Sequence, residues 1–189
     1  LAVALALLLL LGSGAAGCGD DDSDNGDDET DAATDVEDLD LTADDFECIL
    51  NWPKVDKFRI INKLGYQSEA EAVANSPTGG TYPVGTIIQL IPQEAMVKRR
   101  AGFNPASNDW EFFFLEIADT GTTIATRGTT EVTNGLGGNC LDCHSMARSE
   151  FDLICSDANG CEPLPFTAEQ IEQAQNADPR CAQGLALTR

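Results

Sequence analysis

The residues with the clearest chemical potential lie together in the pentapeptide Cys140-Leu141-Asp142-Cys143-His144. Two thiols at this spacing can add to the two vinyl groups of one haem, while the adjacent imidazole reaches the iron. The same cysteines could instead form a disulfide or a dithiol redox pair, supply half of a zinc site, or occur together by chance. Zinc would need two more ligands, and the only histidine of the chain is already in the motif. We therefore predict one covalent haem c on Cys140 and Cys143, with His144 as an axial iron ligand.

The sixth coordination position of that iron is constrained by composition. Because His144 is the only histidine, a second histidine ligand from the same chain is excluded. A methionine, a lysine, a terminal amine or no ligand at all remains. Met146 lies too close to His144 to reach the opposite side of the haem, so Met96 is the methionine candidate, and a methionine in a strand is more often core filler. We expect a five-coordinate iron that is open to small ligands. The alternative is a six-coordinate electron-transfer cytochrome.

Four further cysteines follow the acidic N-terminal part of the chain, namely Cys48, Cys155, Cys161 and Cys181. An even set of this kind in an exported protein predicts two disulfides. The proximity of Cys155 to Cys161 favours that pair and leaves Cys48 and Cys181 to join the ends of the domain, although four cysteines allow three pairings.

The N-terminal part of the chain has the composition of an export signal followed by a spacer. Residues 1–17 form an apolar run with a small-residue end, and residues 15–18 resemble a bacterial lipobox in which Cys18 would receive lipid. An ordinary secretory signal is the alternative. Residues 18–47 are rich in Asp and Glu, and the first basic residue is Lys54, which predicts a disordered acidic tether. We expect a periplasmic or cell-surface protein that is anchored by lipid to a bacterial membrane.

The rest of the chain predicts one folded domain over residues 48–181, followed by a tail over residues 182–189. A β-branched run predicts a strand at 86–91, and an aromatic run predicts one at 110–117. Residues 122–126 are expected to form the return strand of a hairpin, and residues 95–100 a further strand. Capping residues and helix formers predict helices at 68–74, 140–147 and 167–175. The expected fold class is therefore α+β, with a mainly antiparallel sheet, a few short helices and a haem-attachment segment near the C-terminus.

Several of these segments, in this order, carry a family resemblance. Residues 82–88 (YPVGTII), 96–98 (MVK) and 109–113 (DWEFF), followed by the motif at 140–144, resemble cytochrome P-460 and its relative cytochrome c′-beta. The similarity covers roughly residues 52–147. It implies a mainly antiparallel β fold, a five-coordinate haem, and binding or oxidation of nitric oxide and hydroxylamine.

The resemblance and the strand pattern together suggest three residues of the distal pocket. Members named for their unusual absorption carry a lysine bonded to the haem edge, and by position Lys98 is the candidate. An exposed basic strand end, or an ion pair with a haem propionate, is the alternative for Lys98. Glu111 is a candidate acid or base, with Glu116 and Glu131 as alternatives. Phe113 is a candidate apolar cap, although Phe112 and Phe114 on the other face of the strand could serve equally.

The sequence thus predicts a monohaem cytochrome that binds nitric oxide and could act as an oxidoreductase on hydroxylamine. Its expected partners are a small nitrogen-oxide ligand, a redox protein and the membrane, and we allow for a homodimer. The net charge of −21 opposes binding to nucleic acid. A third hypothesis is a structural lipoprotein without haem, in which Cys140 and Cys143 are bridged to each other.

Overall fold

The computed structural model describes residues 37–181. The expected signal peptide, the lipidation site Cys18, most of the expected tether and the C-terminal tail lie outside the described residues. Within them, no helix is long and apolar enough to cross a membrane.

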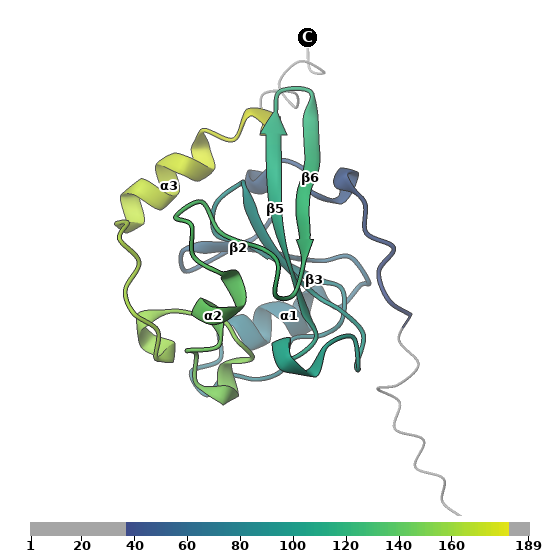
Figure 1. The fold of residues 1–189 in the computed structure, drawn as a ribbon, viewed down its shortest axis with the longest axis vertical. Coiled ribbons are helices and arrows are strands. Elements are labelled where there is room, and N and C mark those ends of the chain that lie inside the picture. Colours follow the sequence, from purple (N-terminus) through teal and green to yellow (C-terminus); the bar gives the residue numbers. More distant parts are fainter. Residues whose placement is uncertain (1–36, 182–189) are drawn as a thin grey trace, which may run out of the picture. The chain divides into compact units, whose positions relative to one another are not determined.

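A single antiparallel sheet of six strands forms the centre of the described chain, with the strands side by side in chain order (Figure 1). The strands are β1 (Lys54–Val55), β2 (Phe58–Asn62), β3 (Thr86–Gln89), β4 (Glu94–Lys98), β5 (Trp110–Ala118) and β6 (Gly121–Gly128). The α-helices are α1 (Gln67–Ala74), α2 (Cys140–His144) and α3 (Ala168–Asn176). Five short 3-10 helices occupy Ala43–Asp45, Ile49–Asn51, Pro105–Ser107, Ser149–Phe151 and Asp157–Asn159. The predicted fold class, α+β with a mainly antiparallel sheet, is confirmed.

The elements predicted from local patterns are present, and two strands were missed. The four predicted strands correspond to β3 to β6, and the predicted helices to α1, α2 and α3. Helix α3 begins with the expected capping box between Thr167 and Gln170. Strands β1 and β2 were not predicted, because their seven residues include Lys54, Arg59 and Asn62 and lack a clear alternation of polar and apolar side chains.

The sheet separates two apolar clusters, because successive side chains of a strand point to opposite faces. The motif face carries Ile88, Met96, Trp110 and Phe112 and packs against α1, α2 and the chain that follows α2. The opposite face carries Ile87, Val97, Phe113 and Leu115 and packs against residues 39–52. The sheet therefore decides which residues can act together with the Cys140–His144 motif.

The segment before β1 is part of the packed structure. Leu41 and Phe46 are buried in the apolar cluster of the opposite face, and the ring of Phe46 lies 5.1 Å from that of Phe113 between centroids. Ordered packing thus begins before the expected domain boundary at Cys48, within the last residues of the segment that we expected to be a tether.

The C-terminal segment is fastened to this N-terminal segment. A disulfide joins Cys48 to Cys181, and the backbone N–H of Ile49 donates to the buried carboxylate of Asp178 at 3.0 Å. Arg180 donates to the same carboxylate and to the carbonyl oxygen of Phe46. The second disulfide joins Cys155 to Cys161. Both predicted cysteine pairs are confirmed.

Candidate functional site

Helix α2, which carries the Cys140–His144 motif, is a single turn positioned by the residues before it. The side chain of Asn139 accepts from the backbone N–H of Asp142 at 3.1 Å and donates to the carbonyl oxygen of Thr130 at 2.8 Å. The N–H of Cys140 donates to the carbonyl oxygen of Val132 at 3.0 Å. Asn139 therefore starts the helix as an N-cap and also ties it to the chain that follows β6.

The two cysteines of the motif are free thiols in different environments. Cys140 is buried in the apolar cluster of the motif face, whereas Cys143 is exposed. Burial, with a smaller contribution from Glu94, raises the pKa of Cys140 to about 12, so its thiol is protonated at neutral pH. The third hypothesis required a bridge between these two cysteines, and they are not bridged.

His144 is held in one tautomer by a backbone carbonyl group. Its Nδ1 lies 2.7 Å from the carbonyl oxygen of Leu153, and since a carbonyl only accepts, Nδ1 carries the proton. Burial lowers the pKa of His144, while the bond to Leu153 opposes that shift. At neutral pH the ring is therefore uncharged, and Nε2 keeps the lone pair that a metal ion requires.

These features fit a covalently bound haem. The motif supplies two free thiols for the two vinyl groups, and one neutral imidazole whose Nε2 is free for iron. A histidine ligand that donates its other ring proton to a carbonyl group is the usual arrangement at protein-bound metals. His144, Cys140 and Cys143 are thus the residues that would hold the group.

The side chains that share the motif face are mostly apolar and aromatic. The ring centroid of Phe112 lies 5.1 Å from that of His144. Met96 is opposite Phe112 in the β4–β5 ladder and belongs to the same buried cluster as Cys140. The structure therefore brings Met96 and Phe112 to the face of the motif.

Lys98 lies at the end of β4 on this same face, but its ammonium group is fully engaged. Nζ donates to both carboxylate oxygens of Asp152, each at 2.8 Å, and to the carbonyl oxygen of Asn108 at 2.7 Å. It also lies 5.2 Å from the centroid of the Trp110 ring. The side chains of Lys98 and Asp152 are each 6% exposed. Lys98 is thus neither an exposed strand end nor free to bond another group while this ion pair holds.

Glu111 and Phe113 lie on the opposite face of the sheet from the motif. Phe113 packs against Phe46, and Glu111 is buried in an ion pair with Arg127, with bonds of 2.7 and 2.9 Å. This pairing raises the pKa of Arg127, mainly through the hydrogen bonds to Glu111. The structure therefore does not bring Glu111 and Phe113 together with His144. The neighbouring phenylalanines, Phe112 and Phe114, lie on the motif face, and of these Phe112 contacts the His144 ring.

The Cys155–Cys161 disulfide lies against the backbone of the motif. Its two sulfur atoms are 3.3 and 3.9 Å from the carbonyl oxygen of Cys143. These are packing contacts, because a disulfide sulfur has no proton to donate. The disulfide thus closes the loop that follows Leu153 at a point next to the motif.

The residues that sequence reasoning missed are Asp152, Leu153 and Tyr82. Asp152 pairs with Lys98, Leu153 orients His144, and the N–H of Tyr82 donates to Asp152 at 2.9 Å. Burial and the nearby charge of Asp152 raise the pKa of Tyr82. No local pattern marked Asp152, because it lies in an irregular loop whose contacts are 54 and 70 residues away in sequence.

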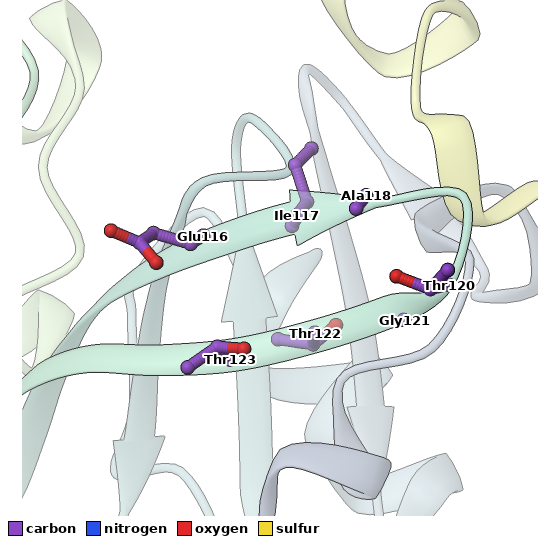
Figure 2. Close-up of a pocket in the computed structure, with 7 residues that line it drawn as sticks. All are labelled: Glu116, Ile117, Ala118, Thr120, Gly121, Thr122 and Thr123. Carbon is purple, nitrogen blue, oxygen red and sulfur yellow. The ribbon is translucent and has the colours of Figure 1, made fainter.

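Two of the cavities in the described residues are lined by residues outside the motif. One of about 230 Å³ lies on the β5–β6 hairpin, and Figure 2 shows its lining residues, with Glu116 at one end. A second, of about 430 Å³, opens onto the Lys98–Asp152 pair. Among residues 37–181, no group of three or more His, Cys, Asp or Glu side chains is arranged to hold a metal ion.

Comparison of the chain with family models, with curated proteins and with solved structures finds no match in any of the three.

Proposed function

We propose that this protein is an extracytoplasmic monohaem c-type cytochrome that binds nitric oxide. The observation that carries the proposal is the state of the motif. Cys140 and Cys143 are free thiols while the other four cysteines of the described residues are paired in disulfides, and His144 has its Nδ1 proton engaged. A bound haem supplies an iron atom that takes small uncharged ligands and exchanges one electron.

The composition of the motif face supports a small uncharged ligand. Met96 and Phe112 are apolar and buried, and the buried charges of Lys98 and Asp152 on this face neutralise each other. A third charge, that of the half-buried Glu94 at the start of β4, accepts a hydrogen bond from the backbone N–H of Gly135. Such surroundings favour nitric oxide over a charged ligand, because a buried unpaired charge is costly. The antiparallel sheet is also what the resemblance to cytochrome c′-beta implies. Hydroxylamine oxidation has less support, since Lys98 and Glu111 are both held in ion pairs.

An electron-transfer cytochrome is the second candidate, and one observation favours it. Met96 lies in the same buried cluster as Cys140 and opposite Phe112, so a thioether is on the same face of the sheet as the motif. If its sulfur completed the coordination of the iron, the site would be closed to gases and would serve electron transfer to a redox partner protein.

The proposed location rests on the disulfides. Two disulfides in one small domain are typical of an oxidising compartment, which is also where c-type haem is attached. We propose that the protein acts at the periplasmic or cell surface side of a bacterial membrane, held there by lipid on Cys18.

The first experiment is export of the full chain in a host that attaches c-type haem, followed by denaturing electrophoresis and haem staining. Thioether-linked haem survives denaturation, so the wild type should stain and the Cys140→Ser/Cys143→Ser variant should not. Loss of both sulfurs of the Cys155–Cys161 pair, by contrast, should leave the stain. An unstained wild type would refute the proposal.

The absorption spectrum then separates the two candidates. An open iron gives high-spin bands that shift when nitric oxide is added, and Met96→Leu should leave these bands unchanged. A low-spin spectrum that is indifferent to the gas, and that becomes high-spin in Met96→Leu, would favour electron transfer. Leu keeps the apolar volume of Met, so the variant tests the sulfur rather than the packing.

A further inference from the structure

Two consecutive residues of the loop after α2, Asp152 and Leu153, adopt left-handed backbone conformations. Their φ angles are 49° and 62°, and both side chains are buried. A leucine in this region is strained, because its Cβ approaches the following carbonyl oxygen. Such a conformation persists only where the surrounding structure holds it. The contacts of Asp152 and Leu153 must therefore offset the strain at Leu153.

Asp152 is held from three directions by residues near the ends of the sheet. Its carboxylate accepts two bonds from Lys98 and one from the backbone N–H of Tyr82. Its own carbonyl oxygen accepts from Nε1 of Trp110 at 2.8 Å. Since Lys98 and Trp110 are opposite each other in the β4–β5 ladder, the rigid sheet fixes both the side chain and the backbone of Asp152.

The next carbonyl group along the chain belongs to Leu153 and accepts from Nδ1 of His144 at 2.7 Å. The backbone of Asp152 thus binds the sheet, and one residue later the same backbone binds the predicted iron ligand. No other hydrogen bond to the His144 ring is found in the described part of the chain. The position of the Leu153 carbonyl group therefore decides how the ring is oriented.

We infer that Asp152 is a positioning residue for His144, and that Lys98 is its partner in this role. Together they hold the Leu153 carbonyl group against Nδ1, which makes Nε2 a stronger electron donor toward a bound metal. Lys98 would then act on the Nδ1 side of the His144 ring, and not on the Nε2 side where a metal would bind. The inference rests on the proposed function, because it concerns the ligand strength of His144 toward haem iron.

The expected effect has a definite sign. A stronger imidazole donor stabilises oxidised iron, so loss of the bond to Leu153 should raise the reduction potential of the haem and weaken the iron–histidine bond. Asp152→Asn removes the charge that binds Lys98 but keeps an acceptor for Tyr82. Asn also tolerates the left-handed conformation, so the backbone preference is preserved. Lys98→Met removes the other partner.

The test measures the reduction potential of the haem-loaded full chain, with the iron–histidine stretching band of the reduced form as a second readout. We expect a more positive potential and a lower band frequency in Asp152→Asn and in Lys98→Met. The matched control is Asp157→Asn, the same change in the same loop at a side chain that is 63% exposed. It should match the wild type in both readouts.

Unchanged potentials in haem-loaded Asp152→Asn and Lys98→Met would overturn the inference while leaving the proposed function intact. If either single variant fails to fold, the double variant Lys98→Met/Asp152→Asn leaves no unpaired charge and should show the same shift, and an unshifted double variant would equally overturn it. If the wild type carries no thioether-linked haem, the proposed function fails, and this inference fails with it.

Discussion

Replacing Lys98 by Met leaves the carboxylate of Asp152 buried without its countercharge. Both side chains are 6% exposed, so solvent screens the pair very little. Removing one partner of a buried pair costs about 3–5 kcal/mol, because the remaining charge is uncompensated. That is a large part of the about 5–15 kcal/mol by which a domain is stable. With an m value of about 2 kcal/mol/M, the urea midpoint of Lys98→Met should fall by about 2 M.

A double-mutant cycle separates this electrostatic effect from lost packing. Asp152→Asn should cost a similar amount, since it leaves the ammonium group of Lys98 buried without a countercharge, with only neutral acceptors such as the carbonyl oxygen of Asn108. The double variant has no buried charge at this position and should cost at most about 2 kcal/mol, far less than the sum of the two single variants. Urea unfolding followed by circular dichroism measures all four proteins under identical conditions.

Additive single effects, each below about 1 kcal/mol, would refute the reasoning, because they are the signature of a solvent-screened surface pair. The surface pair Arg148–Glu150 serves as the internal reference. Its side chains are 52% and 48% exposed, and Glu150→Gln should cost little. The contrast between the two pairs tests burial directly.

Three further predictions concern other parts of the molecule. In haem-free protein, the lowered pKa of His144 means that the unfolded chain takes up the proton first, so stability should fall as the pH drops below about 6.5. His144→Gln, which removes the only histidine, should flatten this slope in urea unfolding between pH 7 and 5, and an unchanged slope would contradict the assignment. Replacing Cys48 and Cys181 by Ser opens a link with a sequence separation of 133 and should cost about 5 kcal/mol in thermal unfolding. A cost below about 1 kcal/mol would show that the link does not restrict the unfolded chain. Glu111→Gln should cost about 1–3 kcal/mol by weakening the bonds to Arg127 yet leave nitric oxide binding unchanged. Weakened gas binding in a folded variant would contradict its placement on the opposite face.

The sequence predicted those parts of the fold that depend on neighbours along the chain. The aromatic run of β5 and the turn before β6 predict a hairpin, and the capping box predicts where α3 begins. The spacing of Cys140, Cys143 and His144 likewise falls within one helical turn. Each of these signals is complete within one continuous stretch of the chain, so no tertiary information is needed to interpret them.

The remaining parts could not be predicted because they depend on which face of the sheet a residue occupies. The alternation of Phe112 and Phe113 required that they point to opposite faces, but not which of them would face the motif. That choice depends on residues 39–52 covering one face and α2 covering the other. Asp152 was missed for a related reason, since its partner Lys98 lies on a strand 54 residues away.

The buried charges of Lys98, Arg99 and Glu111 also favour this arrangement of the two faces. Lys98 and Arg99 are adjacent, yet Lys98 pairs with Asp152 on the motif face, while Arg99 lies 3.4 Å from Glu111 on the opposite face. A slip of one residue in the pairing of these strands would turn every side chain of a strand to the other face. It would bury Glu111 beside the apolar motif face and separate Lys98 from Asp152, and each unpaired charge would cost several kcal/mol. The ion pairs therefore select the register that places Phe112 and Met96, rather than Phe113 and Glu111, beside His144.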